Sequence, residues 1–157
     1  MTFPDAATVA AGILQTVPFA RTLNISLIDL EPDGVGGVRA IAELPDDPAL
    51  HNHVGGPHAG ALFTLGETAS GAVVVATFAD QLDRAVPLTV RADIAYRRLA
   101  RGRVRATARL DSAPAQVVQA LEMGERPEFT VRVSIGTDAT PGLPSAEMTV
   151  VWTLRPR

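Results

Sequence analysis

The segment from His51 to Phe78 reads H-N-H-V-G-G-P-H-A-G-A-L-F-T-L-G-E-T-A-S-G-A-V-V-V-A-T-F and decides the fold. Its first residues are polar or glycine, which is typical of a loop, and the rest is a long run of small and apolar residues, which is typical of a buried helix. Gly55, Gly56 and Pro57 precede this helix, so its first backbone N–H groups lack helical partners and face the loop. Such a helix start can bind an oxygen that carries negative charge.

One carboxylate, Glu67, interrupts the apolar helix. Its neighbours are small and apolar, so we expect it to be enclosed, and enclosed carboxylates are paired or functional. Glu67 follows Gly60 by seven residues, which places both on one helix face but about 10 Å apart along the axis. That separation is too long for Glu67 to act on a carbonyl held at the start of its own helix. A second copy with an antiparallel helix would bring its Glu67 to the first Gly60.

The rest of the chain alternates apolar and polar residues, the pattern of half-buried strands. A short amphipathic helix is expected from about Pro4 to Val17, ended by Pro18, and another around Ala115–Met123. In the strand expected over residues 86–96, we expect Val90 and Tyr96 on one face of the sheet and Thr89 on the other. The six expected strands cover residues 23–30, 38–44, 86–96, 104–110, 129–135 and 148–154.

This order of elements predicts an α+β fold. An apolar helix is best enclosed by an antiparallel sheet that curls around it. We expect a single domain over residues 1–157, with an extra N-terminal helix within residues 1–20 and the central helix over residues 58–79.

Composition excludes several classes of protein. The chain has 157 residues, 46% of them hydrophobic, and a formal net charge of −3, so a globular core is expected and a nucleic-acid or membrane partner is not. It contains no cysteine and no lysine, which excludes disulfides, thiolate nucleophiles and Schiff bases. The apolar run Ala6–Leu14 is too short to span a membrane and has no basic residues ahead of it, so a cytoplasmic protein is expected by elimination.

The loop and helix resemble the hotdog fold, and more narrowly the acyl-CoA thioesterases of the phenylacetate-degradation type. Members of that family carry an Asn, a Gly, then His-Gly-Gly, and an Asp or Glu nine residues beyond the His. The residues that match this pattern at matching spacing are Asn52, Gly55, His58, Gly60 and Glu67, while Ala59 replaces the first Gly of the pair.

The resemblance implies hydrolysis of an acyl-CoA thioester without a cofactor. Glu67 would be the general base or nucleophile, and the N–H groups of Ala59 and Gly60 would stabilise the negative charge that develops on the carbonyl oxygen. Asn52 would orient the water or bind the thioester oxygen, and His58 would polarise the carbonyl or position the loop. The family also implies the antiparallel arrangement of two helices, with sites shared between subunits. We therefore predict an obligate homodimer with two composite sites, alone or as a dimer of dimers.

Other predicted contacts concern the coenzyme. Gly60 has no Cβ and so lets a ligand approach the backbone closely, and Gly55 is expected to bind the substrate; in the other interpretation both glycines serve only backbone turns. The arginines at 97, 98, 101, 103 and 105 form a solvated strand face, and a minority interpretation has Arg101 and Arg103 binding the phosphates of coenzyme A.

Three other hypotheses remain open. The chain could be a non-catalytic acyl-CoA or acyl-ligand binding protein on the same fold, because fold does not determine function. It could be a hotdog hydratase or dehydratase, although the loop–helix spacing differs. His51, His53 and His58 could suggest a metal site, but no matched carboxylate accompanies them, so we predict none. Ser70 lies in no nucleophile-elbow pattern.

Overall fold

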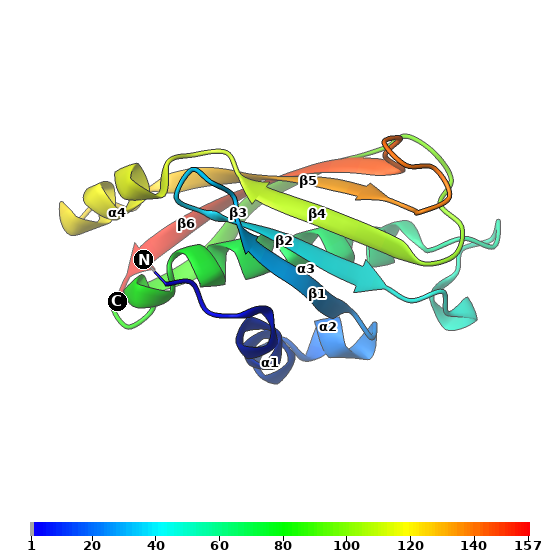
Figure 1. The fold of residues 1–157 in the computed structure, drawn as a ribbon, viewed down its shortest axis with the longest axis horizontal. Helices are drawn as coiled ribbons and strands as arrows, with labels where there is room; N and C mark the ends of the chain where they lie inside the picture. The colour runs from blue at the N-terminus through cyan, green and yellow to red at the C-terminus, as the bar shows by residue number, and fades with distance from the viewer. Residues whose placement is uncertain (1) are drawn as a thin grey trace.

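A six-stranded antiparallel sheet packs on one long helix, α3 (Ala59–Thr77), in the computed structural model, which describes residues 2–157 (Figure 1). Residue 1 of the predicted domain lies outside the described residues. The strand order is β1-β2-β4-β5-β6-β3, and every neighbouring pair is antiparallel. The predicted α+β hotdog class is confirmed. The strands are β1 (Ser26–Pro32), β2 (Val38–Leu44), β3 (Ala85–Tyr96), β4 (Val104–Leu110), β5 (Glu128–Gly136) and β6 (Ala146–Pro156).

The helix α3 lies in the core because almost every side of it is apolar. It contacts β2, β4, β5, β6 and β3. The strands meet it with small buried residues such as Ala42 and Ala108, which let the backbones approach closely. At Gly66 the approach is so close that a Cβ atom would lie 2.6 Å from the Met148 sulfur. The helix is therefore enclosed, as its composition predicts.

The N-terminal region forms two helices where the sequence predicts one. Asp5 caps α1 (Ala6–Thr16) by accepting a hydrogen bond from the Thr8 N–H, and the chain turns at Val17 into α2 (Pro18–Thr22). Pro18 therefore starts a second helix instead of only ending the first, because proline fits the first turn of a helix well. Both helices contact α3, α1 also contacts β1, and Figure 1 places α1 and α2 together beside β1, the edge strand at one side of the sheet. The shorter elements are η1 (Pro48–Leu50), η2 (Ala79–Gln81) and α4 (Pro114–Glu122).

β3 is an edge strand of the sheet and contains a bulge. Its pairing with β6 shifts between Thr89 and Arg91, so Val90 is the extra residue. The Thr89 hydroxyl donates to Glu67 on α3, which places Thr89 on the helix-facing side together with Tyr96. The prediction that Thr89 and Tyr96 lie on opposite faces of this strand is therefore wrong, because a bulge breaks the period-two alternation.

Among residues 2–157, α3 is the one helix that is long and apolar enough to cross a membrane. Most of it is buried against the sheet, so it is the core helix of this fold.

Replacing Leu65 with Ala tests the enclosure of α3. Leu65 is 0% exposed, so the change should lower the free energy of unfolding by about 2–5 kcal/mol through the lost apolar contacts and the cavity left behind. Val35→Ala is the control, because Val35 is 76% exposed and should cost little. Urea titrations of both variants provide the measurement, and equal stabilities would contradict the assignment of Leu65 to the core.

Candidate functional site

The loop before α3 is closed by the side chain of Asn52. Its Oδ1 atom accepts hydrogen bonds from the N–H groups of Val54 at 3.0 Å and Gly56 at 3.2 Å, and its Nδ2 group donates to the Pro57 carbonyl at 3.3 Å. Gly55 lies inside this closed loop at φ +76°, a conformation that favours glycine. Asn52 thus already has structural partners, and only part of its amide remains available to a ligand.

His58 caps the start of α3. Its Nδ1 atom accepts a hydrogen bond from the Gly60 N–H at 2.9 Å, and its carbonyl accepts from the N–H groups of Ala61 and Leu62. An Nδ1 atom that accepts must be unprotonated, so a neutral ring carries its proton on Nε2. Within residues 2–157 the Ala59 N–H has no hydrogen-bond partner, and Ala59 is exposed. One of the two predicted amides is therefore open and the other is occupied by the imidazole.

Tyr96, which the sequence analysis did not single out, lies against the same helix start. Its hydroxyl donates to the Ala59 carbonyl at 2.9 Å, while the next peptide N–H, that of Gly60, donates to His58. The peptide group between Ala59 and Gly60 is thus held at both ends, by the last residue of β3 and by the cap. Partial burial raises the pKa of the Tyr96 phenol, so it stays a hydrogen-bond donor at neutral pH. This role of Tyr96 is visible only in the structure, because Tyr96 and Ala59 are 37 residues apart in the sequence.

Glu67 lies two turns along α3 from the helix start, on the side that faces β3. It is half-buried, and its Oε1 atom accepts a hydrogen bond from the Thr89 hydroxyl at 3.3 Å. None of the ion pairs among residues 2–157 includes it. Burial raises the pKa of the Glu67 carboxyl, and the Thr89 hydroxyl opposes this shift only in part. A half-buried carboxylate with a raised pKa is suited to general acid–base catalysis.

The turn of α3 that carries Glu67 is anchored to the sheet. The Ser70 hydroxyl donates to the Glu67 carbonyl at 2.7 Å and accepts from the Trp152 indole N–H at 3.1 Å. Ser70 is fully buried, so these bonds form in an environment where each is strengthened. The Glu67 backbone is therefore held in place, and its side chain is positioned by β3.

The structure does not bring Glu67 to the helix start within one chain. Gly60 and Glu67 both lie on α3, and their separation of about 10 Å along the axis follows from the helical rise. Thr89 and Tyr96, which contact Glu67 and Ala59 respectively, belong to the same edge strand. The two halves of the predicted site therefore lie along one edge of the molecule.

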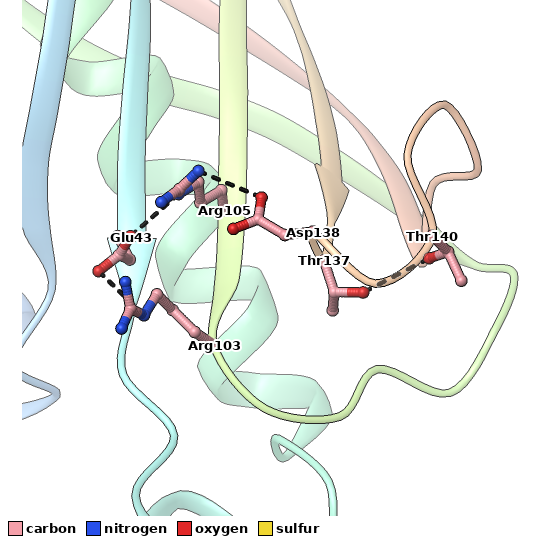
Figure 2. Close-up of polar contacts among 6 residues, drawn as sticks. All are labelled: Glu43, Arg103, Arg105, Thr137, Asp138 and Thr140. Atoms are coloured by element: carbon pink, nitrogen blue, oxygen red, sulfur yellow. Dashed lines mark hydrogen bonds and ion pairs between the residues drawn. The ribbon is translucent and has the colours of Figure 1, made fainter.

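The predicted coenzyme contacts, Arg101 and Arg103, differ in their surroundings. Arg103 pairs with Glu43 at 3.6 Å, and Glu43 also pairs with Arg105 at 3.0 Å, as Figure 2 shows. No carboxylate pairs with Arg101 among residues 2–157, and its guanidinium lies beside Gly55, 3.6 Å from where a Cβ would be. Arg101 is thus the more available cation at the loop.

A cleft of about 520 Å³ opens beside the helix start. Its walls come from α2, the η1 turn and the first turns of α3. A larger groove of about 670 Å³ lies on the outer face of the sheet among charged side chains such as Arg109 and Arg132, but it contains none of the predicted site residues. The residues that line the cleft are Phe19, Leu23, Ala49, Leu50, His51, His58, Gly60, Ala61, Phe63 and Thr64.

The three histidines make separate contacts. His51 lies 2.9 Å from an Asp46 oxygen, His58 caps α3, and His53 is exposed. No group of three or more potential metal-binding side chains occurs in the part of the chain that the structure describes.

Comparisons with known proteins agree with this architecture. A family model described as a domain of unknown function (DUF4442) matches residues 6–154. No curated protein matches the sequence. A solved structure from Pseudomonas aeruginosa, PA5026, described as a protein of unknown function and probable thioesterase, is 25% identical with a TM-score of 0.82, over 100% of this chain and 99% of that one.

Two further structures share the fold at lower identity. A mutant of the thioesterase PA1618 from Pseudomonas aeruginosa has a TM-score of 0.77 and 18% identity, over 99% of this chain and 97% of that one. The PaaI protein of E. coli, from the phenylacetic acid degradation operon, has a TM-score of 0.70 and 16% identity, over 95% and 92%. The resemblance to hotdog-fold thioesterases is thereby confirmed.

Replacing Glu67 with Gln should stabilise the protein at neutral pH. Because burial raises the pKa of Glu67, the folded state binds the proton of this carboxyl more tightly than the unfolded state does. The free energy of unfolding therefore falls as the pH rises from the ordinary pKa of glutamate through the raised pKa of Glu67. The variant removes this loss and should have the higher free energy of unfolding at pH 7, with the difference shrinking below the ordinary pKa of glutamate. Urea titrations at several pH values measure it. A variant that is less stable than the wild type at pH 7 would contradict the desolvation of Glu67.

Proposed function

The chain belongs to the family described as a domain of unknown function (DUF4442), and from this premise we propose that it is a hotdog-fold acyl-CoA thioesterase that hydrolyses an acyl-CoA to the free acid and coenzyme A. The observation that carries the proposal is Glu67, a half-buried carboxylate that forms no ion pair within residues 2–157, has a raised pKa and is held against an edge strand. The relatives described as thioesterases support the same class of reaction.

The carbonyl oxygen of the thioester would bind at the start of α3. The open Ala59 N–H is one donor, and the Nε2–H group of His58 is the second, because its Nδ1 atom is occupied by Gly60. This assignment changes the predicted pair of amides into one amide and one imidazole. Both groups would stabilise the negative charge that develops on the oxygen as the carbonyl carbon is attacked. Tyr96 and the rest of the cap hold the intervening peptide in place.

Glu67 would take a proton from a water molecule, whose oxygen then bonds to the carbonyl carbon. The carbon–sulfur bond breaks, the coenzyme A thiolate leaves, and the proton on Glu67 can pass to that sulfur. Direct attack by the carboxylate is the other route, through an anhydride that water then cleaves. The Thr89 hydroxyl orients the carboxylate in either route. Arg101, free of a carboxylate partner within residues 2–157, would bind a phosphate of coenzyme A more readily than Arg103.

The two halves of the site would come from different subunits of a homodimer. Within one chain Glu67 lies about 12 Å along α3 from Ala59 by the helical rise, which is too far for it to act on a carbonyl bound at Ala59. Glu67, Thr89 and Tyr96 all lie beside the unpaired edge of β3, an edge to which a second copy could pair. A two-fold axis beside this edge would bring each carboxylate toward the other subunit's helix start.

A non-catalytic acyl-CoA binding protein is the alternative. The occupied Gly60 amide favours it, because the helix start already satisfies one of its donors with its own cap. Calorimetry and a thiol-release assay with the same acyl-CoA separate the two functions, since the alternative gives binding without release.

Glu67→Gln and Glu67→Ala should abolish thiol release while the fold is retained, because both remove the proton acceptor. In the wild type, the rate should rise with pH through a midpoint above the ordinary pKa of glutamate, since the active form is the ionised carboxylate and burial raises its pKa. The measurement is thiol release across short, long and aromatic acyl-CoAs. Full activity in Glu67→Gln would reject the mechanism.

Mixing two inactive variants tests the shared site. Ala59→Pro removes the open N–H, and proline suits this first helical position because the preceding residue, His58, has φ −59° and ψ 143°. A mixed dimer of Ala59→Pro and Glu67→Gln has one intact site, so random subunit exchange should restore about a quarter of the wild-type activity. If each site lay within one chain, mixing would restore none.

A further inference from the structure

We propose that the cleft between α2 and the start of α3 holds the acyl group of the substrate, and that the N-terminal helices thereby set the acyl-chain preference. The inference rests on the proposed function in one respect, because it takes the thioester carbonyl to bind at the start of α3. The cleft itself comes from the fold, and it gives α2 a role beyond covering the core.

The position of the cleft supports this occupant. His58 and Gly60 line one end, beside the open Ala59 N–H, so a carbonyl bound there would direct its substituent into the space next to it. The apolar lining comes from three separate segments: Phe19 and Leu23 at α2 and its C-cap, Ala49 and Leu50 of the η1 turn, and Ala61 and Phe63 of α3.

The chemistry of the walls also fits an apolar chain. Among residues 2–157 no Asp, Glu or Arg lines the cleft, and its two polar side chains away from the cap already have partners. His51 contacts Asp46, and the Thr64 hydroxyl donates to the Gly60 carbonyl at 2.9 Å. An uncharged hydrocarbon loses no hydrogen bonds in such a space and gains apolar burial. The volume of about 520 Å³ lies within the usual range of small-molecule sites.

Phe19 is the wall residue most open to test. It is 60% exposed, an unusual state for a large aromatic side chain, yet it lines the cleft. Its exposed ring is explained if an acyl chain covers it in the complex. Because it contributes little to the core, its replacement should change the cleft without unfolding the protein.

The experiment measures binding and turnover of acetyl-CoA and decanoyl-CoA by Phe19→Ala, Phe19→Leu and the wild type. Met123→Ala is the matched control, since Met123 is 65% exposed and ends α4 away from the cleft. Phe19→Ala should lower the affinity and kcat/KM for decanoyl-CoA by about tenfold and leave those for acetyl-CoA unchanged, because only the long chain reaches the ring. Phe19→Leu should restore most of the loss, and Met123→Ala should change neither substrate.

Four outcomes separate the two proposals. Thiol release with a chain-length effect at Phe19 supports both. Chain-length-dependent binding at Phe19 without any thiol release rejects the thioesterase and keeps the acyl site. Thiol release with equal or no change for the two substrates in Phe19→Ala rejects the acyl site and keeps the thioesterase. Conversion of a dimer to monomers by Phe19→Ala, seen by light scattering, would make the cleft a subunit interface and overturn the inference.

Discussion

The enclosure of α3 by the sheet is the constraint on which the rest of the structure depends. Leu62, Leu65, Ala69 and Val73 are buried against the strands, so that face of the helix cannot accept a polar group. What the sheet leaves partly open is a narrow stripe at four-residue spacing, with Phe63, Glu67, Gly71 and Val75 on it. A carboxylate on that stripe is neither solvated like a surface residue nor sealed in hydrocarbon, and this intermediate state produces its raised pKa.

The start of α3 is shaped by a second constraint, that unpaired backbone donors at a helix end must find partners. His58 satisfies the Gly60 N–H and leaves that of Ala59 open. The amide that remains available to a ligand is therefore the one that the cap cannot reach. Tyr96 holds the carbonyl of the same peptide group from the opposite side, which joins the helix start to the edge strand. The positions of the donor groups at the helix start thus depend on the loop that ends at His58, on the first turn of α3 and on the end of β3.

The edge strand β3 connects both parts of the site. Its bulge at Val90 turns Thr89 inward to Glu67 and keeps Tyr96 inward at Ala59. Bulges often occur where a side chain must be re-aimed, and here the re-aimed side chain is the hydrogen-bond donor to the carboxylate. On the outer face, by contrast, Glu43 pairs with both Arg103 and Arg105, and Arg105 also pairs with Asp138 (Figure 2).

What the sequence alone determined follows from local periodicity. The expected strands at 38–44 and 104–110 match β2 and β4 to the residue, because their alternation is strict and each has one buried face. The central helix, expected over 58–79, forms over Ala59–Thr77, since a long apolar run with a cap at His58 allows few other structures. These features predicted an antiparallel sheet around one enclosed helix and singled out Glu67 as an enclosed carboxylate, and the resemblance of the loop and helix to a known family added the hotdog fold.

Only the tertiary structure decided the partners of the site residues. Thr89 and Tyr96 reach α3 across 22 and 37 residues, and no local pattern encodes such contacts. The pattern identified Asn52 as polar and close to the helix, but the closure of its own loop decides where its amide bonds. The catalytic roles stay predictions for the same reason, because they depend on how chains meet. Periodicity records which side of an element is buried, whereas hydrogen-bond geometry depends on where the whole chain brings its distant segments together.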